Sequence, residues 1–222
     1  MIIDLHTHTS PRSDDSKLEL TELIHRARQA GLDAVCVTEH DWFWNKDDLA
    51  RLSEKHNFLV LPGVETNTDD GHFLVFGLDK YTFGMHHTDF LRHLVDESGG
   101  AMILAHPYRR NLNREGDIGE AIERYCQRPF FGDVDIIETC NGRGSDRQNK
   151  FSRELCRRLN LKETGGSDAH ESSDLPSYAT LFERDINNVP ELVAELKAGR
   201  FKVIDLHHGR RKQIWDNDTS LY

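Results

Sequence analysis

Four short motifs along the chain carry histidine and carboxylate side chains, the residue types that bind divalent metal ions. They are, in order, Asp4-Leu5-His6-Thr7-His8, Thr38-Glu39-His40-Asp41, Ala105-His106-Pro107 and Gly166-Ser167-Asp168-Ala169-His170. Successive side chains of a strand point to opposite faces, so His6 and His8 lie on the same side and can hold one ion. With 13 histidines against 4 cysteines, the chain favours imidazole ligands over thiolates.

The first three motifs come at or after the end of a short apolar run that is typical of a buried strand, and the fourth stands late in the sequence. Seven such runs are predicted as strands, at residues 2–6, 34–38, 58–64, 72–78, 101–105, 134–139 and 201–206. Segments with helical spacing of apolar residues lie between them, at residues 18–30, 46–56, 89–98, 118–127, 147–160 and 190–198. In the first of these, Leu20, Leu23, Ile24 and Ala27 form one apolar face, and Gly31 is a typical stop.

Strands that alternate with helices indicate an α/β fold with a mostly parallel sheet, either a closed barrel or a doubly wound sheet. Six or seven repeats of the unit favour the barrel. In an α/β barrel the carboxyl ends of all strands meet at one face, where the active site lies. We therefore expect the motifs, together with Glu65 after the third predicted strand, to converge on one site.

The composition limits the alternatives. A chain of 222 residues without a linker or an internal repeat fits one domain, predicted at residues 1–206, followed by an exposed tail at 207–222. No apolar stretch is long enough for a membrane span and no basic, apolar leader begins the chain, so we expect a cytoplasmic protein.

A net charge of −10 argues against broad attraction to nucleic acid. The cysteines form no Cys-x-x-Cys pair and are interpreted as small core residues.

The order of the four motifs resembles the PHP family, named for polymerase and histidinol phosphatase domains, over essentially the whole chain. The second motif departs from the family's commonest form, because Glu39 stands where Asp is usual. The resemblance implies a distorted seven-stranded β/α barrel and a metal-dependent phosphoesterase activity. Such an enzyme hydrolyses phosphate esters with a hydroxide held between the metal ions.

The resemblance also implies which residues bind two to three zinc, manganese or iron ions. It puts His6, His8, Glu65 and Asp168 around a first ion, and Glu65, His72 and His106 around a second. A third ion would take His40, His170 and either Asp14 or Asp15, of which Asp15 fits the local pattern better. The other histidines lack a place at a strand end and are interpreted as structural or exposed.

Phosphate recognition calls for cations beyond the metals, and the planar fork of arginine suits two phosphate oxygens. Arg109 and Arg143 follow predicted strand ends and are expected to contact substrate. Either His170 or Asp41 could pass a proton to the leaving group, and the sequence does not choose between them. The aromatic residues 42–44 after the second motif either line the pocket, where they could stack on a base, or pack on the rim.

The expected substrate is a small-molecule phosphate ester, with a nucleotide or the end of a short single-stranded nucleic acid also compatible. No Gly-x-Ser-x-Gly motif and no phosphate-binding loop ending in Gly-Lys-Ser/Thr supports another hydrolase mechanism. Two alternatives stay open: a metal-dependent amidohydrolase and a barrel that metal stabilises without catalysis.

Overall fold

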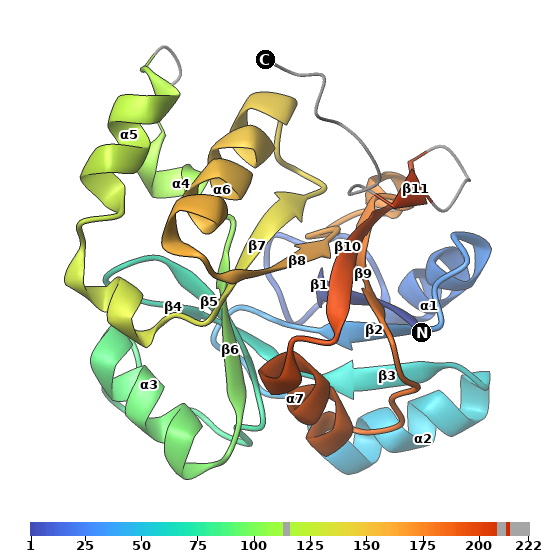
Figure 1. Ribbon diagram of the computed structural model, residues 1–222. Helices are drawn as coiled ribbons and strands as arrows, with labels where there is room; N and C mark the ends of the chain where they lie inside the picture. The colour runs from blue at the N-terminus through green and yellow to red at the C-terminus, as the bar shows by residue number, and fades with distance from the viewer. Residues whose placement is uncertain (113–115, 208–211, 214–222) are drawn as a thin grey trace.

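The computed structural model describes residues 1–112, 116–207 and 212–213, and in this part of the chain the strands form two mixed sheets (Figure 1). The first sheet has six strands. In spatial order they are β11 (Lys212–Gln213), β10 (Phe201–Asp205), β9 (Tyr178–Phe182), β1 (Ile2–Thr7), β2 (Ala34–Val37) and β3 (Leu59–Pro62). Strands β1, β2 and β3 run parallel, whereas β9 is antiparallel to both β1 and β10.

The second sheet has five strands. They are β4 (Val64–Asn67), β5 (His72–Phe76), β6 (Ala101–Ala105), β7 (Ile136–Asn141) and β8 (Lys162–Gly166). Here β4, β5 and β6 are antiparallel neighbours, and β6, β7 and β8 are parallel. The sheet therefore begins as a meander and continues as two βαβ crossovers.

The predicted seven-stranded TIM-like barrel is wrong, because the described strands form two separate sheets and do not close into a barrel. All seven predicted runs contain a strand, but one of them changes sheet at Gly63. A Cβ at Gly63 would lie 2.7 Å from the Phe76 ring, so only glycine permits this close approach. The chain then turns away from β3 and pairs as β4 with β5 in antiparallel fashion.

The two sheets nevertheless meet at the carboxyl ends of their strands. Isolated bridges join His40 to Glu65 and Thr7 to Ala169. These bridges link the end of β2 to β4, and the end of β1 to the segment after β8. Strand ends therefore converge without a continuous ladder around a barrel.

Helices cover the sheets, and all six predicted helices are present with ends shifted by at most two residues. They are α1 (Leu20–Gln29), α2 (Lys46–His56), α3 (Thr88–Glu97), α5 (Ile118–Tyr125), α6 (Asp146–Leu159) and α7 (Val189–Ala198). A short α4 (Tyr108–Asn111) and the 3₁₀ turns η1 (Pro129–Asp133) and η2 (Ser172–Asp174) were not predicted. In α1 the predicted face of Leu20, Leu23, Ile24 and Ala27 is buried, as the 3.6-residue spacing requires.

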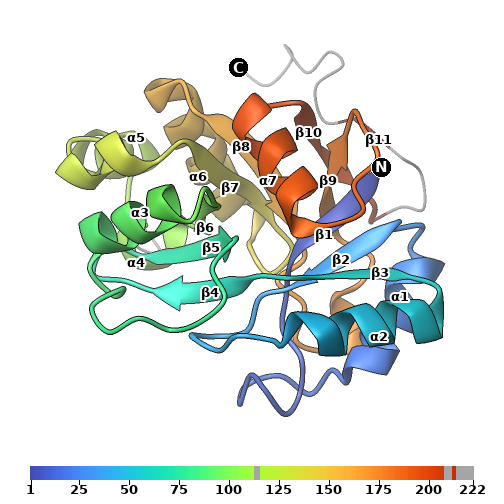
Figure 2. The same ribbon diagram turned by 90° about the horizontal axis from the view of Figure 1, so that it is seen from below.

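Three apolar clusters make the core. One lies between the five-stranded sheet and helices α3, α5 and α6, and a second packs β1 and β2 against α1 and α2. A third joins residues of both sheets to α7, which lies between them in the view from below (Figure 2). This shared cluster fixes one sheet against the other and so holds the converging strand ends in place.

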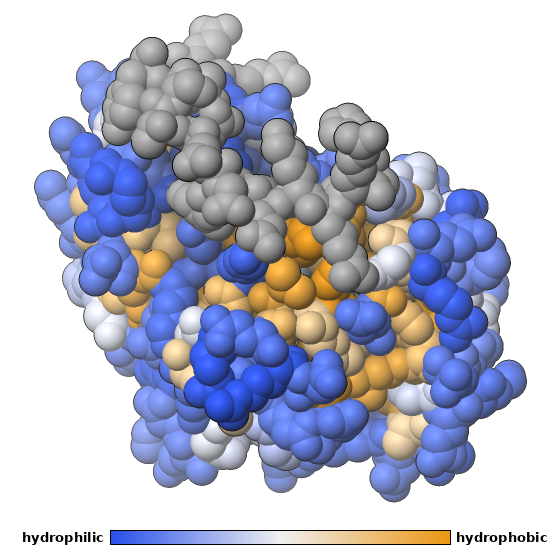
Figure 3. Space-filling view, turned by 45° about the vertical axis from the view of Figure 1, so that its right-hand side comes forward, coloured by the Kyte–Doolittle hydropathy of each residue, from blue (hydrophilic) through white to orange (hydrophobic). Residues whose placement is uncertain are grey.

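The surface matches the polar composition. Hydrophilic residues cover most of the face in Figure 3, around a smaller apolar area. Among the described residues no helix is both long and apolar enough to cross a bilayer. Most of the predicted tail at 207–222 lies outside the described residues; within it, β11 pairs with β10.

Candidate metal centre

The side chains of the four motifs meet where the two sheets adjoin. Backbone bonds set this meeting point: His8 N–H donates to the Ala169 carbonyl at 2.9 Å, and Asp168 N–H donates to the His6 carbonyl at 2.8 Å. On the other side, Asp41 N–H donates to the Glu65 carbonyl at 2.9 Å. The motifs are thus brought together by main-chain hydrogen bonds at strand ends, as the sequence predicts.

Glu65 lies at the centre of the cluster and is 1% exposed. Its Oε1 is 2.9 Å from His72 Nδ1 and 2.8 Å from His106 Nε2. Its Oε2 faces the other way, 3.2 Å from His8 Nε2 and 3.0 Å from His40 Nδ1. One carboxylate thus presents an oxygen to each of two sets of imidazoles, the geometry of a ligand shared between two cations.

Two carboxylate oxygens of this cluster are buried without a hydrogen bond to any described residue: Glu65 Oε2 and Asp168 Oδ1. Asp168 Oδ1 lies 3.4 Å from His6 Nε2 and 3.5 Å from His8 Nε2. Buried polar atoms are nearly always paired, so such oxygens beside ring nitrogens indicate a missing partner. A divalent cation fits that place, because imidazole nitrogen and carboxylate oxygen are suitable ligands for zinc, manganese and iron.

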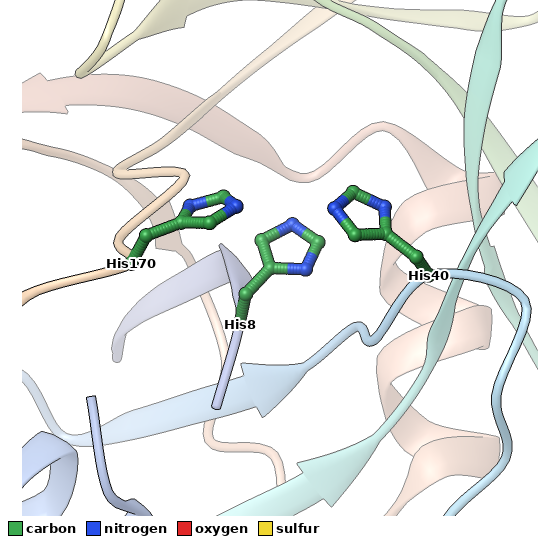
Figure 4. A group of neighbouring side chains, drawn as sticks. All are labelled: His8, His40 and His170. Carbon is green, nitrogen blue, oxygen red and sulfur yellow. The ribbon is translucent and has the colours of Figure 1, made fainter. Parts of the chain in front are cut away.

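A third set lies on the side of His8 away from His106. The rings of His8, His40 and His170 point toward one another from three different segments of the chain (Figure 4). Asp15 Oδ2 is 3.2 Å from His170 Nε2 and 3.4 Å from His40 Nε2. The structure therefore places Asp15 where the third predicted ion would need a carboxylate.

Altogether, four groups of possible ligands are found among the described residues, and all consist of predicted residues. The groups are His6–His106–Asp168, His6–His8–Glu65, Glu65–His72–His106 and His8–His40–His170. His6, His8, Glu65 and His106 each belong to two groups, and of these only the sharing of Glu65 was predicted. None of the groups includes a cysteine. Cys36, Cys140 and Cys156 are buried free thiols as expected, whereas Cys126 is only partly buried. The histidines predicted to be structural, such as His25, join none of these groups.

Burial and charge divide the imidazoles into two classes. Burial lowers the pKa of His8 to about 4 and also lowers the pKa of His106. Burial acts in the same direction on His6, but Glu138, Asp168 and Glu65 outweigh it and hold the pKa of His6 well above its usual value. His40 also has a raised pKa, because Glu65 and Asp15 overcome its burial.

These directions predict proton release when metal binds. Near pH 7 the metal-free protein keeps His6 protonated, since its pKa is raised, whereas His8 is already neutral. A metal ligand must be neutral, so loading should release protons, and their number is the sum of those lost by His6 and His40. Calorimetric titration with zinc in buffers of different ionisation enthalpy measures this number, and a titration that shows no proton release at pH 7 would contradict the assignment.

Three residues at the site have a left-handed backbone, which is uncommon outside glycine. They are Asp41 (φ 48°), His106 (φ 28°) and Asp168 (φ 55°). Strained residues of this kind tend to gather at functional sites, where surrounding contacts hold them. Their presence at three of the strand ends agrees with a site shaped for a ligand.

Glu138 is a buried residue of the site that the sequence analysis missed. Its Oε1 is 2.9 Å from His6 Nδ1, and its Oε2 accepts hydrogen bonds from His106 N–H and Asn141 Nδ2. Such a carboxylate orients an imidazole so that Nε2 faces a metal. A charged residue inside the apolar run Ile136–Thr139 was the available signal.

The predicted substrate residues occupy different environments. Arg109 is exposed, but its Nη2 is bonded to Asp168 Oδ2, so its guanidinium touches the ligand cluster directly. Arg143 is also exposed, and in the part of the chain that the structure describes only its backbone N–H is bonded, to Asn141 Oδ1 at 3.0 Å. Asp41 accepts from Asn67 N–H, and burial raises its pKa. Both ring nitrogens of His170 are engaged, with the Asp168 carbonyl and with Asp15.

The aromatic residues after the second motif pack mainly on the rim. Phe43 and Trp44 lie against two of the core clusters, and Trp44 donates to Glu39. Trp42 contacts Trp44 edge to face, with the Arg12 guanidinium 4.3 Å from its ring centre. These contacts agree with packing on the rim, which is one of the two interpretations that the sequence leaves open.

Solved structures share this fold at low sequence identity. PsfC from Pseudomonas syringae PB-5123 is 20% identical with a TM-score of 0.62, over 92% of this chain and 91% of PsfC. A two-domain protein containing a predicted PHP-like metal-dependent phosphoesterase, from Bacteroides vulgatus ATCC 8482, is 20% identical with a TM-score of 0.64. The match covers 91% of this chain and 64% of that protein. An amidohydrolase from Chromobacterium violaceum with bound sulfate is 19% identical with a TM-score of 0.59, over 93% and 99% of the chains.

Sequence comparison identifies the family. A PolC-type DNA polymerase III from Oceanobacillus iheyensis is 34% identical over 70 residues, which are 31% of this chain and only 5% of the polymerase. The family described as PHP domain matches residues 4–125, more than half of the chain, and the PHP-associated family matches residues 146–201. The chain, with its ligand-bearing motifs at converging strand ends, therefore belongs to the PHP domain family.

Proposed function

We propose that this protein is a metal-dependent hydrolase of phosphate esters that works with two to three divalent transition-metal ions. The observation that carries the proposal is the pair of buried oxygens, Glu65 Oε2 and Asp168 Oδ1, that lack a hydrogen bond among the described residues and face imidazole nitrogens. Membership of the PHP family supports it, as does the description of the Bacteroides vulgatus relative as containing a metal-dependent phosphoesterase.

The residues fit three positions for ions. His6, His8, Glu65 and Asp168 would hold the first, and Glu65 would share its other oxygen with a second ion at His72 and His106. His40, His170 and Asp15 would hold a third. Divalent ions bound there would activate water and neutralise the charge of a phosphate ester.

The chain's own groups would orient the ester and manage its proton. Arg109 holds Asp168 Oδ2, which leaves Oδ1 directed at the imidazoles, and its remaining N–H groups can reach a phosphate oxygen. Asp41 is the better candidate for passing a proton to the leaving oxygen, since burial raises its pKa and it belongs to none of the ligand groups of the described residues. His170 is better placed as a ligand, because both of its nitrogens already have partners.

A chelation experiment tests the proposal. Purified protein reconstituted with zinc or manganese should contain about two to three ions per chain and hydrolyse an aryl phosphate, and a chelator should abolish that hydrolysis. Phosphomonoesters, nucleoside bisphosphates, short oligonucleotides and amides would then be compared as substrates. One ion or none after reconstitution contradicts the multinuclear site, and hydrolysis of amides alone would favour the amidohydrolase alternative.

Arg143→Ala should lower kcat/KM for phosphate esters by about 10-fold, as expected for a charge-assisted contact to phosphate. Its metal content should not change, because its side chain forms no ion pair with a described ligand residue. Arg143→Lys should recover only part of the activity, since a single ammonium cannot make a two-pronged contact. Lys150→Ala, an exposed cation on α6, is the matched control. Equal kinetics for Arg143→Ala and Lys150→Ala would remove Arg143 from the site.

A further inference from the structure

Glu39 is a fully buried carboxylate beside the candidate metal centre, yet it belongs to none of the four ligand groups. Its Oε2 accepts from Thr9 N–H at 2.9 Å and from the Ser13 hydroxyl at 2.5 Å. Its Oε1 accepts from the Thr9 hydroxyl and from Trp44 Nε1, the latter at 3.0 Å. Each of these four groups carries a proton that it can donate to a carboxylate oxygen.

Ser13 connects this carboxylate to a ligand. Its Oγ is 3.2 Å from His8 Nδ1 as well as 2.5 Å from Glu39 Oε2. A hydroxyl has one proton, and a carboxylate can only accept, so that proton is directed to Glu39. The remaining lone pairs of Ser13 can then only accept from His8, which places the ring proton of His8 on Nδ1.

This tautomer leaves a lone pair on the other nitrogen of His8. His8 Nε2 lies 3.0 Å from His6 Nε2 and 3.2 Å from Glu65 Oε2, at the centre of the ligand cluster. A neutral imidazole binds metal through its unprotonated nitrogen, and the hydrogen bond at its other nitrogen decides which one that is. The opposite tautomer would direct an N–H at the position of the ion.

We propose that Glu39 and Ser13 are positioning residues that fix His8 in the Nδ1–H tautomer, so that its Nε2 is available to bind a metal ion. This inference rests on the proposed function, because it assigns a purpose to a ligand of that site. Glu39 acts on His8 only through the Ser13 hydroxyl. It differs in this respect from Glu138, which contacts the His6 ring directly.

The same carboxylate also joins two of the three segments that supply the third set of ligands. Thr9 and Ser13 belong to the loop that carries Asp15, and Trp44 follows His40. Three side chains that donate to one buried acceptor leave these loops few alternative arrangements. Loss of Glu39 should therefore disturb His8 first and the Asp15 loop second.

Two variants that each lack one hydroxyl distinguish the proposed relay, from Glu39 through Ser13 to His8, from a general effect on packing. Ser13→Ala removes the link to His8, whereas Thr9→Val removes a hydroxyl that donates to the same carboxylate but does not contact His8. Zinc affinity, measured by competition with a chelating dye, should fall about 10–100-fold in Ser13→Ala, the usual effect of losing a partner behind a ligand. In Thr9→Val it should change by less than about 3-fold, a smaller effect than loss of such a partner.

Nitrogen-15 NMR of the histidine rings in the metal-free protein gives a second measurement. His8 should be the Nδ1–H tautomer in the wild type and in Thr9→Val, and a mixture of tautomers in Ser13→Ala.

The Glu39→Gln variant tests the same effect on zinc binding from the carboxylate side. Its amide group places donors against the donors of Thr9, Ser13 or Trp44, so it should weaken zinc binding at least as much as Ser13→Ala.

The outcomes distinguish failure of the proposed metal centre from failure of the proposed role of Glu39 and Ser13. A wild-type protein that binds no zinc would overturn the proposed function itself. If the wild type binds zinc but Ser13→Ala and Thr9→Val show equal affinity and the same His8 tautomer, the relay is wrong while the metal centre stands. Circular dichroism spectra and melting temperatures of all variants establish that each is folded before affinities are compared.

Discussion

The Glu65→Gln variant is expected to lose bound metal and phosphoesterase activity together, each by more than about 100-fold. Loss of a partner that only orients a ligand typically costs about 10–100-fold, and Glu65 is placed as a ligand itself. Its two oxygens face different sets of imidazoles, so one substitution affects two positions for ions. An amide has one acceptor oxygen and no negative charge to hold two cations a few ångströms apart.

The control for this variant is His25→Ala. His25 is exposed on α1, and its Nε2 lies 2.9 Å from Gln29 Nε2 of the same helix. Elemental analysis and hydrolysis of an aryl phosphate on the same preparations compare the two variants. Equal loss in both would show that the division between site residues and structural histidines is mistaken.

The meeting of candidate ligands such as His6, His8 and His106 could be predicted from the sequence, because each stands at or directly after the end of an apolar strand. A run such as Ala101–Ala105 identifies the strand through its apolar residues, and His106 follows directly. Strand ends meet in any α/β arrangement that shares a core, so convergence did not depend on the barrel. His72, at the start of β5, and Asp15, in the loop after β1, do not follow an apolar strand directly, and the division of all the candidate ligands among ions rests on the family resemblance.

The pairing of strands could not be predicted in the same way. Strand β8 reads Lys162-Glu163-Thr164-Gly165-Gly166 and has no large apolar residue, so hydropathy does not reveal it. Its glycines are needed for contact with neighbouring segments: a Cβ on Gly165 would lie 2.9 Å from the Ala179 carbonyl oxygen. The direction of β9, antiparallel to β1, likewise depends on tertiary contacts and leaves no local pattern.

Glu138 and Glu39, the carboxylates that support candidate ligands, could not be predicted for a related reason. Glu138 and His6 are 132 residues apart, and Glu39 and Ser13 are 26 apart, so no local spacing links either pair. The sequence does show that Glu138 lies within one apolar run and that Glu39 directly follows another. A buried charge requires partners, and that requirement can be stated before the partners are known.

Glu138→Gln should weaken metal binding by about 10–100-fold even though the residue touches no proposed ion, because partners that orient ligand imidazoles have effects of this size. Both Glu138 oxygens accept hydrogen bonds: Oε1 faces His6 Nδ1, and Oε2 receives His106 N–H and Asn141 Nδ2. A glutamine has only one oxygen for these donors. Its amide N–H groups must therefore oppose either the His6 ring or the pair at His106 and Asn141, and in both cases a ligand shifts.

The matched control is Glu163→Gln on the neighbouring strand β8. Glu163 is mostly buried and accepts from the Thr139 hydroxyl at 2.8 Å, but it contacts no imidazole. Both variants remove one partly or fully buried carboxylate from the same sheet, so a general loss of stability should affect them alike. Zinc affinity separates the two explanations: a fall confined to Glu138→Gln supports orientation of His6, whereas equal affinities would reduce Glu138 to a structural residue. Because Glu138 helps to raise the pKa of His6 in the metal-free protein, Glu138→Gln should also release fewer protons on zinc binding than Glu163→Gln.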